Sequence, residues 1–210
     1  MRTYQQFCGV AKALDLVGDR WTLLIVRELL IRGASRYTDL REGLPGVATN
    51  LLVDRLRELE EAGLVERHEA PPPVATMLYR LTPRGQTLQP VLRELGRWAL
   101  PLIGEPKRGD AFRPHWLAGP VWVHMRDHKP ERPPITLELR TLDGALTVEA
   151  ARGEIRTRAG TSDHADLVVS GPPKAMVDVL AGRLSVAAAR AKGVTYQGDL
   201  SALRRLQPRA

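Results

Sequence analysis

The sequence is poor in cysteine and has no long apolar run. A single cysteine in 210 residues excludes an internal disulfide framework and a zinc site built from several cysteines. Charged residues interrupt every apolar stretch well short of the roughly 18 residues that a membrane-spanning helix needs. The N-terminus, MRTYQQFCGVAK, lacks the apolar segment of a signal peptide. We therefore expect a cytoplasmic protein with no membrane partner.

The sequence also lacks a catalytic or metal-binding pattern. His124 and His128 have the i, i+4 spacing of a helical metal site, but no third ligand accompanies them. There is no Ser-His-Asp order, no Gly-rich phosphate loop and no Cys-His pair, and SGPPK and GDL are turn sequences. We expect neither an enzyme nor a bound metal or cofactor.

The charge is positive overall but not concentrated where a nucleic-acid reader would need it. The net charge of +7 favours a polyanionic partner. Residues 1–104, however, hold 14 Lys and Arg against 12 Asp and Glu, while residues 105–210 hold 17 against 12. Any argument for DNA binding must therefore rest on individual arginines rather than on total charge.

The N-terminal half contains a series of short amphipathic helices. Apolar spacing predicts helices over residues 9–17 and from about Arg20 to Ile31, the second capped by Asp19. Ser35 is predicted to cap a short helix over residues 36–43. The helix over residues 36–43 and the helix that follows it form a pair that predicts a helix-turn-helix.

The stretch from Pro45 to Gly63 predicts the second helix of that pair. Leu52, Leu56 and Leu59 form an apolar stripe, and Gly63 lies where a glycine commonly ends a helix. The opposite face carries side chains suited to base edges and phosphates. An ordinary amphipathic surface helix would show the same pattern, so the choice between the two depends on the segments before and after it.

After Gly63 the apolar period changes from that of a helix to that of a strand. LVERHE and MLYRLT predict two strands joined by the turn APPPVAT, which is the wing of a winged-helix domain. Thr82 then caps a helix predicted to run to about Ile103, with Pro83 in its first turn. Its apolar stripe is long enough that we assign part of it to a dimer interface.

Residues 8 to about 103 resemble the HxlR-type winged helix-turn-helix regulators of bacteria. The matching motifs are GDRWTLLI, LPG, NLL, RLREL, EEAGLVER and LTPRG, in that order. The resemblance implies a homodimer on double-stranded DNA. We name as DNA contacts Arg36, Thr38, Thr49, Asn50, Val53, Asp54, Arg55 and Arg57. The predicted wing tip carries no Lys or Arg, so we expect the helix to supply most of the affinity.

Residues 104–113 predict a linker, and the remainder resembles the sterol carrier protein-like fold. ITLELRT, ALTVEAA, EIRTR and ADLVVSG predict strands, with Glu138 on the polar face of the first. PHWLAGPVWVHMRDH is predicted to be helical with an interruption at Gly119-Pro120, and further helices follow the strands. The resemblance rests on ADLVVSGPPKAMVDVLAGRLS and the GD that follows. It implies an apolar small-molecule ligand. We name as the residues that line its binding site Trp116, Leu117, Val121, Trp122, Met125, Met176, Val179 and Leu180.

The sequence therefore predicts an α+β protein with two domains. Residues 1–105 form a winged helix-turn-helix domain for DNA binding and dimerisation, and residues 106–210 a sterol carrier protein-like α/β sandwich. The predicted function is a transcription regulator, a repressor, controlled by the apolar ligand. One alternative is a redox or electrophile sensor acting through Cys8, because a thiol near a helix N-terminus can be reactive. Others are a lipid carrier with secondary DNA binding and an architectural DNA-binding protein.

Overall fold

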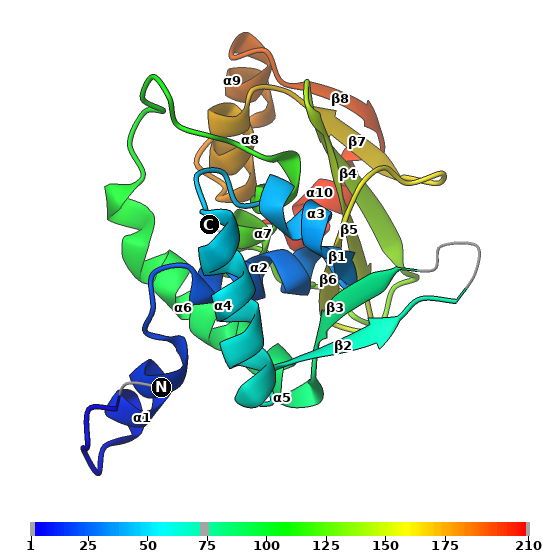
Figure 1. The fold of residues 1–210 in the computed structure, drawn as a ribbon. Coiled ribbons are helices and arrows are strands. Elements are labelled where there is room, and N and C mark those ends of the chain that lie inside the picture. Colours follow the sequence, from blue (N-terminus) through cyan, green and yellow to red (C-terminus); the bar gives the residue numbers. More distant parts are fainter. Residues whose placement is uncertain (1–2, 72–75, 209–210) are drawn as a thin grey trace. The chain divides into compact units, whose positions relative to one another are not determined.

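The structure is a computed structural model that describes residues 3–71 and 76–208 (Figure 1). The chain divides into two compact units, residues 1–92 and 93–210. The sequence prediction places the boundary after residue 105, whereas this division falls within a helix. The units are described below one at a time.

The helices of the first unit are built around one apolar core. Those that precede the wing strands are α1 (Gly9–Val17), α2 (Thr22–Arg32), α3 (Tyr37–Glu42) and α4 (Thr49–Glu61). The core joins Ile25 and Leu29 of α2, Leu40 of α3, and Leu52 and Leu56 of α4, each at most 2% exposed. Because each helix contributes one apolar stripe, the opposite face of α4 is left for solvent or a partner.

A three-stranded sheet completes this winged helix-turn-helix unit. The order is β1-β3-β2, with β1 (Ser35–Arg36), β2 (Val65–Glu69) and β3 (Met77–Leu81). The two wing strands were predicted, but β1 was not. Ser35 pairs with Tyr79 rather than capping α3, and Arg36 takes the cap position, so that prediction is wrong. The predicted wing tip at residues 72–75 lies outside the described residues.

The predicted helix from Thr82 to Ile103 is divided. It consists of α5 (Pro83–Gln86), α6 (Gln89–Ala99) and the 3₁₀ turn η1 (Leu100–Leu102). Thr82 caps α5 as expected, accepting the Gly85 N–H at 3.1 Å. Pro90 explains the break, because within a continuous helix its ring would clash with the carbonyl of Gln86. It is tolerated in the first turn of α6, where no intrahelical donor is needed.

The second unit is a five-stranded sheet with helices. The strand order is β6-β5-β4-β7-β8, and only the β4–β7 pair is parallel. The strands are β4 (Ile135–Thr141), β5 (Gly144–Ala151), β6 (Glu154–Ala159), β7 (Leu167–Ser170) and β8 (Thr195–Gly198). All four strands predicted before Gly171 are confirmed. The likeness to the sterol carrier protein-like fold stays a prediction.

The helices of this unit gather on one side of its sheet (Figure 1). They are η2 (Pro114–Leu117), α7 (Ala118–His124), α8 (Pro173–Leu180), α9 (Val186–Ala191) and α10 (Leu200–Leu206). Gly119-Pro120 does not interrupt the segment as predicted, because Pro120 lies in the first turn of α7, where its missing N–H costs nothing. Leu137, Leu139 and Val148 face inward and are fully buried.

Two buried carboxylates hold the second unit together. Glu138, on the face of β4 predicted to be polar, is 1% exposed and accepts from Arg140 Nε at 2.7 Å and the Ser162 N–H at 3.0 Å. Asp127 accepts two hydrogen bonds from Arg205 of α10, at 2.7 and 2.8 Å. Removing the partner of a buried charge strongly destabilises the fold, because that charge then stays buried without compensation.

The Asp127–Arg205 pair makes the second unit sensitive to acid. The Arg205 guanidinium lowers the pKa of Asp127 to about 2 from its ordinary 3.8. Because the folded value lies below the unfolded one, the stabilisation, about 2 kcal/mol, is complete above pH 4 and lost as the pH falls toward 2. Urea unfolding at pH 6 and pH 2.5, followed by tryptophan fluorescence, should show this loss in the wild type.

The Asp127→Asn variant should be less stable at pH 6 and should lack this part of the acid dependence. Asp143→Asn changes an exposed acid in the turn after β4 and serves as the matched control. Equal acid dependence in the wild type and in Asp127→Asn would contradict the assignment.

Candidate nucleic-acid interface

Helix α4 is fixed at both ends and along one side. Its apolar stripe, Leu52, Leu56 and Leu59, is 0–2% exposed. At its C-terminus the Leu64 N–H donates to the Leu59 carbonyl at 2.9 Å, and Gly63 has a φ of +66°. This is a Schellman motif, in which glycine relieves the strain of a left-handed residue. The outward face of α4 therefore has a defined orientation.

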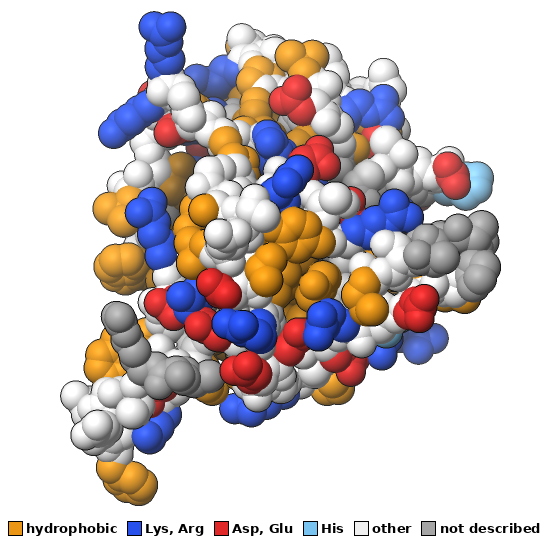
Figure 2. Space-filling model, viewed as in Figure 1, with side chains coloured by type: hydrophobic (Ala, Val, Ile, Leu, Met, Phe, Trp, Pro, Cys, Tyr) orange, Lys and Arg blue, Asp and Glu red, His pale blue; other side chains and the backbone are white. Residues whose placement is uncertain are grey.

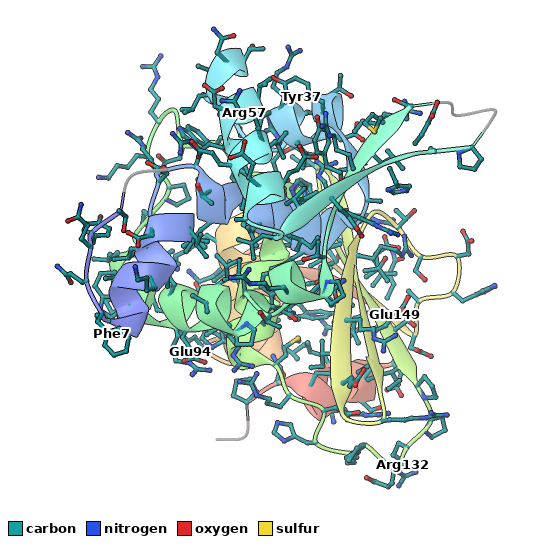
Figure 3. All side chains as sticks on the ribbon, turned by 60° about the horizontal axis from the view of Figure 1, so that its bottom comes forward. Phe7, Tyr37, Arg57, Glu94, Arg132 and Glu149 are labelled. Atoms are coloured by element: carbon teal, nitrogen blue, oxygen red, sulfur yellow. The ribbon has the colours of Figure 1, made fainter. Side chains whose placement is uncertain are left out.

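Most of the predicted reading residues lie on that outward face. Thr49, Asn50, Val53 and Arg57 are exposed, and Asp54 is half-buried. The Arg57 guanidinium lies 3.3 Å from Asp54 Oδ1, and its side chain is 64% exposed. Figure 3 shows Arg57 on α4 and Tyr37 on α3 at the same end of the first unit. Asp54 thus orients Arg57 without burying it.

Arg55 does not belong to this face. It is two residues from Arg57, and at about 3.6 residues per turn such positions lie on nearly opposite sides of a helix. Its side chain is 18% exposed and pairs with both Asp19 and Glu58. Asp19 was predicted to cap α2, but Trp21 has that position. The structure therefore gives Arg55 and Asp19 a shared role in holding α4 against the segment before α2.

The start of α3 lies next to the start of α4. Arg36 and Thr38 are both exposed there, and the Arg36 N–H donates to Asp39 Oδ2 at 3.0 Å. The Tyr37 hydroxyl donates to the Thr49 carbonyl at 3.1 Å. This bond ties the two helix starts together, so groups offered by α3 and α4 keep a fixed relation.

A buried charge that the sequence did not reveal lies behind this pair of helices. Glu28 of α2 is 0% exposed and pairs with Arg27 at 2.8 Å and with Arg32 at 3.2 Å. A Cβ added at Gly43, at the end of α3, would lie 2.1 Å from its Oε2. The turn between α3 and α4 therefore needs a residue without a side chain, and Glu28 fills that space.

The surface around α4 is mixed in charge. On the wing, Arg67 pairs with Glu60 at 2.6 Å and Arg80 with Glu66 at 2.8 Å. Figure 2, viewed from the side on which α4 faces the reader, shows positive and negative side chains intermixed along the helix. Such a surface gives a weak general attraction for phosphates, so specificity must come from individual contacts.

The predicted ligand residues lie in the interior of the second unit. Trp116 is half-buried, and the others are at most 8% exposed: Leu117, Val121, Trp122, Met125, Met176, Val179 and Leu180. The Trp122 indole N–H donates to Thr157 Oγ1 at 3.2 Å. These side chains therefore share one apolar interior.

Cys8 is a free, exposed thiol immediately before α1. Its carbonyl accepts the Lys12 N–H at 2.9 Å, the first hydrogen bond of that helix. Among residues 3–71 and 76–208, no three His, Cys, Asp or Glu side chains come together as metal ligands. None of the helices in those same residues is long and apolar enough to cross a membrane.

Comparison with known proteins identifies the first half of the chain. The family model described as HxlR-like helix-turn-helix matches residues 16–105. The HTH-type transcriptional regulator YvaP of Bacillus subtilis is 39% identical over 88 residues, which are 42% of this chain and 81% of YvaP. Regulator YodB of the same organism is 37% identical over 87 residues, 41% of this chain and 77% of YodB.

Solved structures of YodB are also similar. Its reduced form is 32% identical over 49% of this chain and 100% of YodB, with a TM-score of 0.41. Its quinone-bound form is 34% identical over 43% of this chain and 93% of the other, with a TM-score of 0.37.

One relative extends the similarity into the second unit. The HTH-type transcriptional regulator Mb3122 of Mycobacterium bovis is 35% identical over 133 residues, 63% of this chain and 68% of its own length. A match of that length exceeds the 92 residues of the first unit. The chain thus belongs to the HxlR-like helix-turn-helix family of transcriptional regulators, which bind DNA.

Proposed function

We propose that the chain is a dimeric repressor that reads double-stranded DNA with α4. The observation that carries the proposal is the exposed arc of Asn50, Val53 and Arg57 on a helix whose other side is buried. Arginine suits guanine, asparagine suits adenine, and an apolar side chain suits the thymine methyl group. The arc therefore offers three kinds of base contact.

Phosphate contacts are assigned to the residues that flank this arc. Arg36 and Thr38 at the start of α3, and Thr49 at the start of α4, present a guanidinium and two hydroxyls that are all exposed. Contacts of this kind position a helix in the groove without reading sequence. The Tyr37–Thr49 hydrogen bond keeps both helix starts in register for the same strand of DNA.

The exposed side of α6 is the proposed dimer interface. Val91, Leu95, Trp98 and Leu102 follow one another at i, i+4, i+7 and i+11, and they are 45–74% exposed. Apolar side chains in such a row mark an interaction surface. Figure 2 shows apolar side chains exposed over the region where Figure 1 places α6. A two-fold dimer would carry two α4 helices to half-sites about 34 Å apart.

We assign control of the repressor to the second unit. Its apolar interior, which includes Val121, Met125 and Met176, supports a lipid-like effector. An effector that favours one spacing of the two α4 helices changes the operator affinity, and by linkage DNA changes the effector affinity by the same factor.

The second mode of control is a thiol switch at Cys8. Its support is the exposure of the thiol and the similarity to YodB, which has been solved with a bound quinone. The thiolate sulfur adds to a ring carbon of a quinone, and a proton goes to the ring oxygen. The adduct adds a bulky group directly before α1.

Arg57→Ala should weaken binding to the operator by about 10–100-fold, the value of one bidentate base contact. Binding to DNA from upstream of the protein's own gene is measured by fluorescence anisotropy, beside a scrambled duplex. Arg156→Ala removes a 79%-exposed arginine of the second unit and should change nothing. An equal loss on both duplexes would assign Arg57 to phosphate rather than to a base.

Trp98→Glu should convert the dimer to a monomer, because it buries a charge in the proposed interface. Sedimentation velocity of the full chain measures the change. Leu142→Glu is the control, since Leu142 is an exposed apolar residue that has no part in the α6 row. A dimer that survives Trp98→Glu, or a monomeric wild type, would contradict the proposal.

The Cys8→Ser variant distinguishes control by an apolar effector from control by the thiol switch. Native mass spectrometry of the purified protein should find an apolar molecule bound equally to the wild type and to Cys8→Ser. If 1,4-benzoquinone releases the wild type from DNA but not Cys8→Ser, the thiol switch is the control. A carrier with secondary DNA binding would hold the apolar molecule and show no preference for the upstream DNA.

A further inference from the structure

Tyr196 places a hydroxyl group in the second unit that is buried and unpaired. The residue lies on β8, an edge strand of the five-stranded sheet. It is opposite Val169, which pairs in turn with Leu139, and both of these are fully buried on the face that the helices cover. The Tyr196 oxygen is itself buried and has no hydrogen-bond partner among the residues that the structure describes. Such a group destabilises the fold, because it loses its hydrogen bonds to water without replacing them.

A second hydroxyl on the same face of the sheet shows the contrast. Thr157 of β6 lies opposite Val148, and its Oγ1 accepts the Trp122 indole N–H at 3.2 Å. The Arg190 guanidinium lies over the Tyr196 ring, 5.9 Å from the ring centroid, but does not bond the hydroxyl. Burial raises the pKa of the Tyr196 phenol, with Arg190 acting in the opposite direction, so the hydroxyl keeps its proton at neutral pH. The unpaired group is therefore a hydrogen-bond donor.

Helix α9, which carries Arg190, covers this margin of the sheet thinly. Its sequence is VAAARA, and Ala189 is its buried residue. A segment held by few buried apolar contacts opens locally at a small cost in free energy. Strand β8 also has a neighbouring strand, β7, on one side only. A ligand can therefore enter here between strand and helix and reach the Tyr196 hydroxyl.

We propose that the effector of the second unit is an apolar molecule with one uncharged polar end, whose oxygen accepts a hydrogen bond from Tyr196. Its apolar part lies against the inner face of the sheet, beside Val169. A carbonyl or hydroxyl oxygen suffices for this bond, whereas burial of a carboxylate would cost far more free energy. The inference rests on the proposed control of the repressor by a ligand in this unit, and it adds the chemistry of that ligand.

The first test measures the stability of the full chain without ligand. Tyr196→Phe deletes the hydroxyl and keeps the ring beneath Arg190, so the urea midpoint should be unchanged or higher. Thr157→Val is the matched control. It also removes a hydroxyl from this face, but it leaves the Trp122 N–H without its acceptor and should lower the midpoint. An equal fall in both variants would overturn the proposal, because the Tyr196 hydroxyl would then be bonded within the protein.

The second test measures ligand binding to the full chain by NMR amide shifts. The probe is methyl octyl ketone, and its control is the alkene in which a methylene group replaces the carbonyl oxygen. The ketone should bind about fivefold more weakly to Tyr196→Phe than to the wild type, which is the loss of one neutral hydrogen bond. The alkene should bind both proteins equally, because it offers Tyr196 no acceptor.

Two results of this titration would contradict the inference. If the ketone binds both proteins equally, Tyr196 does not recognise the polar end, and the proposed apolar effector site stands without it. If neither probe binds, the effector site of the second unit fails as well. Operator binding and its loss in Arg57→Ala are measured separately, so failure of the DNA-reading function is distinguishable from both results.

Discussion

Burial of the leucine stripe of α4 is the constraint on which the rest of the first unit depends. Leu52, Leu56 and Leu59 can reach the core in one rotation of the helix only, so their burial decides which side chains remain outside. Arg55 is turned toward Asp19 and Arg57 toward solvent for the same reason. The candidate interface is thus a consequence of packing on the far side of the helix.

Local sequence patterns predict many elements of the fold. Elements and contacts that depend on pairing between distant residues could not be predicted from the sequence. The helix period of residues 49–61 and the strand period of β2 and β3 are visible in the chain itself. Strand β1 has two residues and exists only because Ser35 and Arg36 meet β3 more than 40 positions later. The roles of Glu28 and Glu138 depend likewise on partners that periodicity does not reveal, although Pro90 was a local signal for the break before α6.

The outward arc of α4 was equally predictable, but the assignment of its neighbours was not. Arg55 falls within the same short sequence as Asn50 and Arg57, and residue type alone gives it the same chemistry. Its exclusion follows from a partner, Asp19, that lies 36 residues away. The hydrogen bond from Tyr37 to Thr49 was also invisible, since tyrosine in an amphipathic helix indicates packing as readily as positioning.

The near balance of charge in the first unit is a physical reason for the proposed dimer. Affinity for DNA rests largely on neutralised phosphates, and residues 1–92 hold 12 Lys and Arg against 11 Asp and Glu. Several cations near α4 are paired within the protein, such as Arg67 and Arg80. One such unit should therefore bind DNA weakly, whereas in the proposed dimer the second half-site would be bound as an intramolecular step. Under the proposed function, a change in the spacing of the two units alone would then control most of the affinity for DNA.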